Sequence, residues 1–407
     1  MEMLLFRSVT LPNGLNVLAE PNSTAHSFAA GFFVRTGSRD EMLEAWGVSH
    51  FLEHMLFKGS DRLDWEAINR IFDEIGARYN AFTTQEMTAY YAAVIPEFTT
   101  PLVEHLHELI RPSLREKDFE TEKNVILEEI AMYADEPGQR AYEKLMELHF
   151  DQDPLGRSVI GTEASIKAMT QPQMRRYFDS RYGAANTAIV MSGKFDVDEM
   201  FGLIEQTFHE MPTGELRPTR QSARPSGRTD RIVDPKLNRQ YTMAMCPAPS
   251  AQDEDRFAAR VLADVIGDAE GSRFYWALID PAIAEDADFG YYPHDACGSF
   301  FLSLTSDPDK SEQSLDIARA ELARVRKDLN ESEVERARNK IAAQLTLGSE
   351  NPLGRLRAIG SEWAYNRKYR SLDEDMNSLM SIKIDTLHRL LERYWFEPMT
   401  TITLGPK

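Results

Sequence analysis

The sequence predicts an α+β protein made of two similar halves that are joined by a linker. In residues 1–211, short segments with the two-residue period of a strand alternate with longer segments with the period of a helix. Residues 212–231 are rich in Pro, Gly, Ser and Arg, which is typical of a linker. Residues 232–407 then repeat features of the first half at a constant offset. We therefore expect a first domain at 1–211 and a homologous second domain at 232–407.

The composition is that of a globular chain with an acidic surface. The 407 residues are 42% hydrophobic and carry a formal net charge of -19. This charge disfavours nucleic acid or an anionic membrane as a partner, because either would require a basic patch. The N-terminal residues show no signal peptide and no apolar run is long enough to span a membrane, so we expect a cytoplasmic protein. Cys246 and Cys297 are far apart in the sequence, and we expect two small buried residues and no disulfide framework.

The first elements are strands around a turn. The turn residues Pro12-Asn13-Gly14 separate the two segments of a predicted hairpin, and a further strand is expected near residues 28–35. A helix is predicted over 65–75, because its periodic pattern ends at a glycine, a usual C-terminal stop. Two β-rich segments follow, at 77–84 and 87–95.

Helices predominate in the rest of the first half. Their apolar periodicity predicts helices at 99–111, 116–135, 139–150, 164–182 and 196–209, with a buried strand at 188–193. His105 and His107, in the first of these helices, are about 200° apart around the axis, so they cannot share one metal ion. We expect both histidines to lie at the surface or in an interface.

The stretch from Ser49 to Lys58 has the pattern of a zinc site with a general base. On a helix, with about 100° per residue, His50, Glu53 and His54 fall within about one third of the circumference. Histidines four residues apart can both place a ring nitrogen about 2.0 to 2.1 Å from one zinc ion. Glu53 can take the proton of a zinc-bound water, whose pKa the metal lowers to about 7. The order H-x-x-E-H is the inverzincin pattern.

A third ligand is expected on a second helix, because two protein ligands leave a zinc site incomplete. Glu122 and Glu129 are seven residues apart and so share one helical face, next to an apolar stripe that should be buried. We predict that Glu129 is the third ligand and that Glu122 orients a histidine or balances the charge of the site. Glu128 is the competing ligand, although it lies about 100° away from that face.

The histidine stretch, together with the later glutamates, resembles the pitrilysin-type zinc peptidases, and the chain looks like a half-sized bacterial member similar to the β subunit of mitochondrial processing peptidase. The resemblance also covers Thr10 to Leu15 and extends more weakly through the second half. It implies one zinc per chain on His50, His54 and Glu129. It also implies the mitochondrial processing peptidase-like metallohydrolase fold, with a mostly antiparallel sheet packed with helices in each half. The implied activity is a zinc-dependent endopeptidase that hydrolyses short or unfolded peptides inside a chamber.

The family resemblance also assigns a substrate strand to residues 80–83. In the family the matching strand lies at a sheet edge next to zinc and pairs with the substrate backbone, which here implies Asn80, Ala81, Phe82 and Thr83. Physically this is strand addition, in which main-chain hydrogen bonds hold any extended peptide. The alternative is an ordinary edge strand without a substrate. Cobalt or manganese could replace zinc in a site of two histidines and a carboxylate.

An internal repeat relates the two halves. Arg181-Tyr182 corresponds to Arg393-Tyr394 at an offset of 212 residues, and the strand ending at Gly193 corresponds to the one ending at Gly405. The same offset places three apolar residues opposite the predicted site residues 50, 53 and 54, namely Leu262, Val265 and Ile266. The second half therefore resembles a copy of the first that has lost its metal.

Two such halves make about half of the family's closed chamber, so the resemblance implies a homodimer or a heterodimer with a homologous subunit. In some relatives the C-terminal unit supplies an arginine and a tyrosine that polarise the substrate carbonyl, and residues 297–304 carry no such pair. Arg273, Tyr291 or Tyr292 could substitute. The alternative functions are a non-catalytic or partner-dependent subunit of a two-chain peptidase, and a zinc hydrolase of small molecules.

Overall fold

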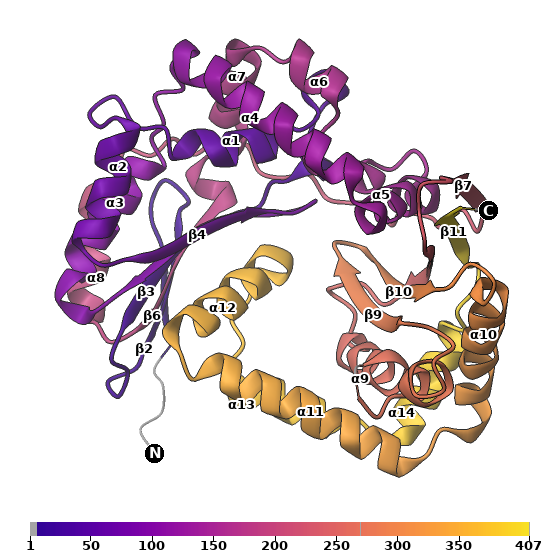
Figure 1. Cartoon of the computed structure of the whole chain (residues 1–407). Helices are drawn as coiled ribbons and strands as arrows, with labels where there is room; N and C mark the ends of the chain where they lie inside the picture. Colours follow the sequence, from indigo (N-terminus) through magenta and orange to yellow (C-terminus); the bar gives the residue numbers. More distant parts are fainter. Residues whose placement is uncertain (1–5, 269, 407) are drawn as a thin grey trace. The chain divides into compact units, whose positions relative to one another are not determined.

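The computed structural model describes residues 6–268 and 270–406, and these form two compact units (Figure 1). Unit 1 contains residues 6–131, 157–219 and 347–370, and unit 2 contains the rest of the described chain. No helix within the described ranges is both long and apolar enough to cross a membrane. Each unit is built around one β-sheet.

The sheet of unit 1 has six strands in the order β1-β2-β6-β3-β5-β4. The strands are β1 (Arg7–Thr10), β2 (Asn16–Pro21), β3 (Phe28–Val34), β4 (Arg78–Thr83), β5 (Thr88–Val94) and β6 (Thr187–Gly193). All neighbouring pairs are antiparallel except β2 with β6. The predicted hairpin turn joins β1 to β2, and Gly14 in it has a φ of +98°, which other residues rarely adopt. Because β4 is the last strand in the order, one side of its backbone has no partner strand in this sheet.

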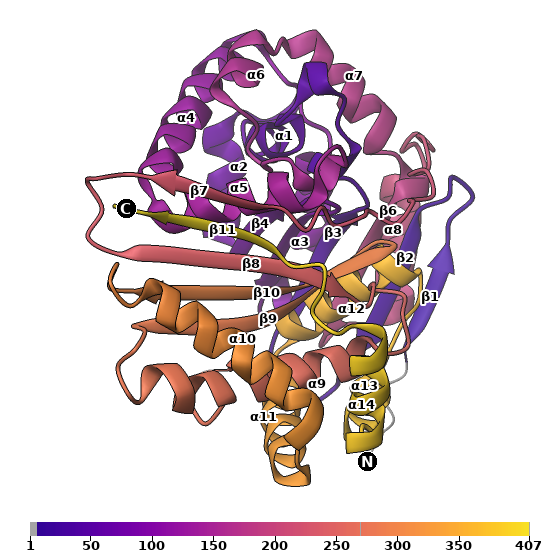
Figure 2. The same cartoon turned by 90° about the vertical axis from the view of Figure 1, so that its right-hand side faces the viewer.

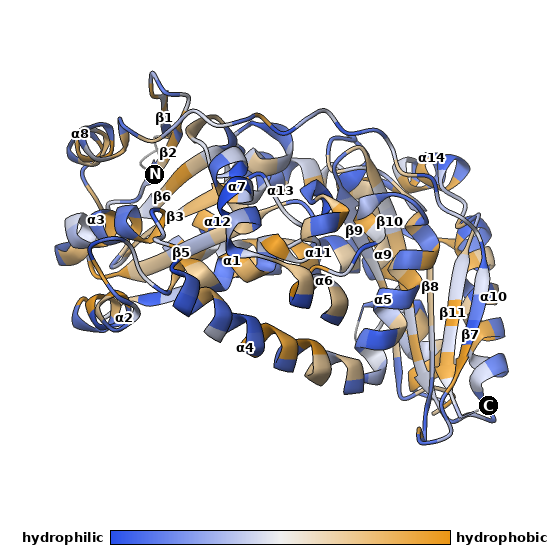
Figure 3. Cartoon of the chain, turned by 90° about the horizontal axis from the view of Figure 1, so that it is seen from above, coloured by the Kyte–Doolittle hydropathy of each residue, from blue (hydrophilic) through white to orange (hydrophobic). Residues whose placement is uncertain are grey.

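Helices cover one face of this sheet and pack their apolar sides on it, as α2, α3 and α8 show in Figure 3. They are α1 (Val48–Leu56), α2 (Trp65–Glu74), α3 (Thr99–Leu109), α4 (Glu116–Asp135), α6 (Glu163–Ala168), α7 (Gln171–Arg181) and α8 (Val197–Phe208). Among them, α1 packs against the edge strand β4. The arrangement therefore puts the helix with the histidine motif beside an edge strand.

The opposite face of the sheet is covered by α12 (Pro352–Asn366), which comes from far along the chain. Its apolar residues Ile359 and Trp363 are buried with Phe33 of β3. Arg355 of α12 donates two hydrogen bonds, of 2.8 and 2.6 Å, to the carboxylate of Glu20 in β2, and both side chains are buried. A bidentate pair of this kind fixes the helix on the sheet by geometry as well as by charge.

The sheet of unit 2 has five strands in the order β7-β11-β8-β10-β9 (Figure 2). The strands are β7 (Thr229–Val233), β8 (Gln240–Ala248), β9 (Asp286–His294), β10 (Cys297–Ser306) and β11 (Thr400–Gly405). One face packs on α9 (Arg256–Gly267), α10 (Ser311–Asp328), α11 (Glu331–Ser349), α13 (Leu372–Met380) and α14 (Ile384–Arg393), and the other face packs on α5 (Pro137–Phe150). Both cysteines, Cys246 and Cys297, are buried in this unit, as expected.

The predicted offset of 212 residues relates elements of the two units. It maps α7 onto α14 and β6 onto β11, and it places α1 over α9. In α9 the counterparts of the motif residues, Leu262, Val265 and Ile266, are all buried apolar side chains. The compact units nevertheless differ from contiguous ranges, because α5 from the first half packs in unit 2 and α12 from the second half packs in unit 1. Where the homologous domains begin and end in sequence stays a prediction.

Two local expectations were wrong. The single helix expected over 164–182 is two helices, α6 and α7, because Thr170 begins a new helix and Pro172 follows in its first turn. His105 is buried and not at the surface, with its ring edge-on to Phe72 at 4.3 Å. Within the predicted linker, Arg217 is buried and donates a hydrogen bond to the carbonyl of Glu86, and β7 begins at Thr229; the bounds of the linker stay a prediction.

Candidate metal centre

The N-terminus of α1 is fixed by a buried carboxylate. Gly47, the residue before the helix, has a φ of +92°, and both its amide and that of Ser49 donate to Glu41 at 2.7 Å. The hydroxyl of Ser49 also lies 2.7 Å from the hydroxyl of Tyr177 in α7. Burial raises the pKa of Glu41 to about 7, although the two amide bonds oppose this shift. Glu41 therefore satisfies otherwise unpaired amides and holds the first turn of the helix in place.

His50, His54 and Glu129 converge on one point. Their nearest ligand atoms all lie within 4.8 Å of one another, with Glu129 carried there by α4. His50 Nε2 is 3.7 Å from Glu129 Oε1, and His54 Nε2 is 3.8 Å from Glu129 Oε2. These distances are too long for hydrogen bonds but suit atoms that share a metal, since two ligands of a tetrahedral zinc are about 3.4 Å apart. Glu128 is exposed and is not in this group.

The donor set fits a zinc ion. Two imidazole nitrogens and one carboxylate are a known catalytic zinc set, with a fourth position left for water or substrate. Burial, with a smaller contribution from His54, lowers the pKa of His50 to about 3, so its ring is neutral as a metal ligand must be. The other ring nitrogen, His50 Nδ1, is buried without a hydrogen-bond partner. These features favour a bound cation over an ion pair between His50 and Glu129.

A chain of charged groups orients His54. Its Nδ1 lies 2.9 Å from Glu122 Oε1, and Lys58 Nζ lies 2.5 Å from Glu122 Oε2. Burial raises the pKa of Glu122, but the bonds from His54 and Lys58 outweigh it and the net shift is downward. Burial lowers the pKa of His54, but Glu122 and the other nearby carboxylates outweigh it and the net shift is upward. Glu122 therefore fixes the ring of His54 with Nε2 directed at Glu129, which is how a carboxylate behind a metal-binding histidine orients it.

Glu53 lies beside this cluster without joining it. Its carboxylate accepts a 2.6 Å hydrogen bond from the hydroxyl of Thr83 in β4. Burial raises the pKa of Glu53, and the bond from Thr83 opposes this shift. A carboxylate with a raised pKa next to a metal position is suited to accept a proton from water.

The edge strand β4 borders the same site. A cavity of about 270 Å³ is lined by Glu53 and His54 on one side and by Asn80 and Ala81 on the other. Phe82 differs from its neighbours, because its side chain packs with the cluster on the opposite face of the sheet. Of the four predicted strand residues, two line the cavity, Thr83 bonds Glu53, and Phe82 can contribute only its backbone.

Two residues of this site were missed from the sequence. Lys58 could have been found, because it follows His54 by four residues and so lies on the same helical face. Glu41 gave no such signal, since it lies outside the helix and reaches the N-terminal amides only through the loop before it.

Two of the three proposed substitutes for a carbonyl-polarising pair already have hydrogen-bond partners in unit 2. Arg273 is buried and bonds both Glu333, at 2.8 Å, and Asp328, at 2.6 Å. The hydroxyl of Tyr291 donates to the carbonyl of Pro249 at 2.9 Å. Tyr292 is 41% exposed.

Comparisons with known proteins agree with this geometry. Residues 16–163 match the family model "Insulinase (Peptidase family M16)", and residues 168–341 match "Peptidase M16 inactive domain". Similar curated proteins are named uncharacterized zinc proteases. The one from Streptomyces coelicolor is 28% identical over 98% of this chain and 89% of its own, and the one from Rickettsia felis is 28% identical over 98% of both. The one from Bacillus subtilis is 26% identical over 99% of this chain and 98% of its own.

Solved structures show the same fold. A protease from Helicobacter pylori aligns with a TM-score of 0.92 and 20% identity over 99% of this chain and 100% of that one. A peptidase M16 inactive domain from Pseudomonas fluorescens also has a TM-score of 0.92, with 19% identity over 99% and 98%. These likenesses confirm the predicted α+β fold of two similar halves.

Proposed function

Because the chain belongs to the peptidase M16 family, we propose that it is a zinc-dependent endopeptidase that hydrolyses short or unfolded peptides. The observation that carries the proposal is the convergence of His50, His54 and Glu129 beside Glu53. Curated relatives over nearly the whole chain are named zinc proteases, which supports the same kind of activity. We expect one zinc per chain.

His50, His54 and Glu129 would hold the zinc, and Glu53 would act as the general base. A zinc ion there would lower the pKa of a bound water toward about 7 and polarise the substrate carbonyl. Glu53 takes a proton in the first step and can return it to the leaving amine. Thr83 holds the Glu53 carboxylate in place, while Glu122 fixes the ring of His54. The roles of these side chains follow from their contacts and stay proposals.

The substrate is proposed to add to β4 as a further strand. Since β4 is a sheet edge that borders the cavity of Glu53 and His54, an extended peptide paired with it would pass next to the base. Backbone pairing does not depend on side chains, so we expect broad sequence tolerance and a requirement for extended substrates.

A partner subunit is proposed to complete the site. Arg273 and Tyr291 already have hydrogen-bond partners within unit 2, so neither can polarise a substrate carbonyl without first breaking those bonds. We therefore expect a homodimer or a heterodimer. A chain that binds zinc but needs another subunit for cleavage is the second candidate function, and the engaged Arg273 favours it.

The test is cleavage of a mixed library of unstructured peptides by the purified chain, with and without a chelator, alongside its mass in solution. If the chain needs no other subunit for hydrolysis, we expect a dimer that cleaves the peptides and stops when the chelator is added. Zinc loading without cleavage would favour the partner-dependent subunit. Glu53→Gln should keep zinc and lose hydrolysis, and cleavage at the wild-type rate by this variant would contradict the proposal.

A matched pair on α4 tests the third ligand. Glu129→Gln should lose zinc, whereas Glu128→Gln, one residue earlier and exposed, removes the same charge and should keep it. Zinc content after dialysis distinguishes the two variants. Equal zinc content in both would contradict the assignment of Glu129.

A further inference from the structure

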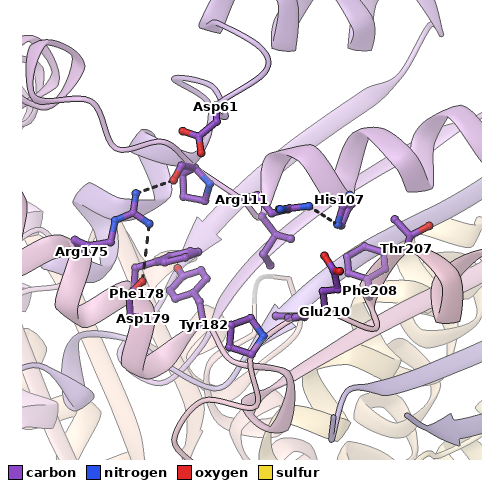
Figure 4. Close-up of a pocket in the computed structure, with 14 residues that line it drawn as sticks. Asp61, His107, Arg111, Arg175, Phe178, Asp179, Tyr182, Thr207, Phe208 and Glu210 are labelled. Carbon is purple, nitrogen blue, oxygen red and sulfur yellow. Dashed lines mark hydrogen bonds and ion pairs between the residues drawn. The ribbon is translucent and has the colours of Figure 1, made fainter. Parts of the chain in front are cut away.

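Unit 1 contains a second cavity that shares no lining residue with the cavity of the metal centre. It has a volume of about 580 Å³ and lies where the C-terminal ends of α3, α7 and α8 come together (Figure 4). This volume is within the range of about 300 to 1,000 Å³ that is usual for small-molecule sites. The mechanism proposed above does not use this cavity.

Aromatic rings line the cavity from two sides. Phe178 and Tyr182 stack with their centroids 5.0 Å apart, and Phe208 lies across from them (Figure 4). The ring of His107 meets Phe208 edge-on at 4.8 Å. Aromatic faces and edges in this arrangement favour an aromatic ring as the apolar part of a ligand.

Arg111 supplies a cation at the same cavity. Arg111 is exposed, the only polar contact of its guanidinium within the described chain is long, 3.4 Å from Nη1 to His107 Nε2, and no carboxylate of the described chain pairs with it. Burial and the neighbouring Arg111 lower the pKa of His107, so its imidazole is neutral near pH 7. His107 therefore adds no second positive charge that would compete with Arg111 for an anion. An arginine in this state can bind a carboxylate with both of its terminal nitrogens.

The other arginine of the cavity is not available in the same way. Arg175 Nη2 already donates to the carbonyls of Pro112 and Ser113, at 2.9 and 2.8 Å, and Nη1 lies 3.9 Å from Asp179. Its guanidinium also lies over the ring of Phe178. Arg175 therefore shapes the wall, and Arg111 is the cation left for a ligand.

We propose that this cavity binds a small aromatic carboxylate, with its ring between Phe178 and Phe208 and its carboxylate on Arg111. Two sources share this chemistry: a free aromatic amino acid, and the C-terminal aromatic residue of a peptide. Asp61 and Glu210 also line the cavity, so the ammonium group of a free amino acid can pair with a carboxylate there. This second charge favours the free amino acid.

The test measures binding by calorimetry to the full chain in the presence of a chelator, so that no probe is cleaved and the result does not depend on peptidase activity. The probes are L-phenylalanine, 3-phenylpropionate, phenethylamine and acetyl-Gly-Gly-Phe. L-phenylalanine and 3-phenylpropionate should bind saturably, and phenethylamine, which lacks the carboxylate, should not. Tighter binding of L-phenylalanine than of the peptide identifies the free amino acid as the source, and the reverse order identifies a peptide C-terminus.

Two variants and a control locate the site. Arg111→Gln should weaken binding about tenfold or more, because a charged hydrogen-bond donor is lost. Phe178→Leu should also weaken it, while Arg70→Gln, which removes an exposed arginine of α2 away from the cavity, should not. Thermal unfolding of each variant checks that it is folded. No saturable binding by any carboxylate probe, or unchanged binding by Arg111→Gln, would overturn the proposal.

Discussion

The hydroxyl of Thr83 lies 2.6 Å from the carboxylate of Glu53, so the edge strand β4 is tied directly to the proposed general base. The strand that would receive the substrate and the group that would accept the proton therefore cannot move independently without breaking this bond. A hydrogen bond to an ionised carboxylate contributes more than one between neutral groups.

Replacing Thr83 by Val should make cleavage more sensitive to acid. Burial raises the pKa of Glu53 and the bond from Thr83 opposes that rise, so its loss moves the pKa further upward. Since the base must be ionised, the acidic limb of the profile of kcat/KM against pH should move to higher pH. We expect about tenfold lower kcat/KM near neutrality. Thr83→Ser, which keeps the hydroxyl, should restore the wild-type profile, and an unmoved acidic limb in Thr83→Val would contradict the role of this bond.

Replacing Glu122 by Gln should weaken zinc binding. Gln lacks the charge that holds the ring of His54 and places an amide donor next to Lys58, which is itself a donor. Loss of such a supporting carboxylate typically costs about tenfold to a hundredfold in metal affinity. A competition titration against a chromophoric chelator measures this change. Glu120→Gln, on the exposed side of the same helix, is the control and should bind zinc as the wild type does.

Replacing Glu41 by Gln should change how stability depends on pH. The pKa of Glu41 is about 7 in the folded chain against an ordinary value of 4.5, so between these values the folded state holds a proton that the unfolded state has lost. The free energy of unfolding therefore falls as the pH rises through this window, by about 3 kcal/mol from this group. Gln does not titrate. The free energy of unfolding of the wild type minus that of Glu41→Gln should therefore fall by that amount as the pH rises through this window.

Urea denaturation at pH 4.5 and pH 7.5, with a chelator present throughout, measures this difference. The wild type and Glu41→Gln share every other titrating group. The relevant quantity is therefore how the difference between their free energies of unfolding, called the gap here, changes between the two pH values. A gap that stays constant across the two pH values would mean that Glu41 is ionised throughout.

Replacing Gly360 by Ala should destabilise unit 1 although alanine is the better helix former. A Cβ at this position of α12 would come within 2.3 Å of the ring of Phe33, which is fully buried, so the ring or the helix would have to shift. We expect a loss of about 1 to 3 kcal/mol in the free energy of unfolding. The same change at Gly202 in α8, where a Cβ meets nothing, should instead add up to about 1 kcal/mol. Denaturant titrations of both variants give the comparison.

Much of this architecture follows from local sequence signals. The bounds of α4 were predicted at both ends, and the hairpin turn before β2 was found from its Pro-Asn-Gly sequence, because periodicity and turn chemistry act over a few residues. His50 and His54 were expected to point the same way for a similar reason, since helical spacing fixes which side chains share a face, whereas Glu129 of α4 was joined to them by the need for a third ligand and by the family resemblance.

The rest depends on contacts between segments that are distant in sequence. The burial of His105 results from Phe72 on another helix, and the carboxylate of Glu41 is used by α1 through a loop. From the sequence, Arg273 could serve to polarise a substrate carbonyl, but in the folded chain it bonds Asp328 and Glu333, which lie more than fifty residues away in sequence. Periodicity in one segment carries no information about which other segment packs on it, so these outcomes required the structure.

The position of α12 in unit 1 has a consequence for synthesis at the ribosome. The sheet of this unit has an apolar face, including Phe33 and Val190, that is covered by residues 352–366. Since translation proceeds from the N-terminus, the strands of this sheet, the last of which ends at Gly193, are made well before the residues that cover this face. The nascent chain must therefore carry an uncovered apolar sheet face from the synthesis of β6 until residues 352–366 have been made, and unit 1 is completed only after that.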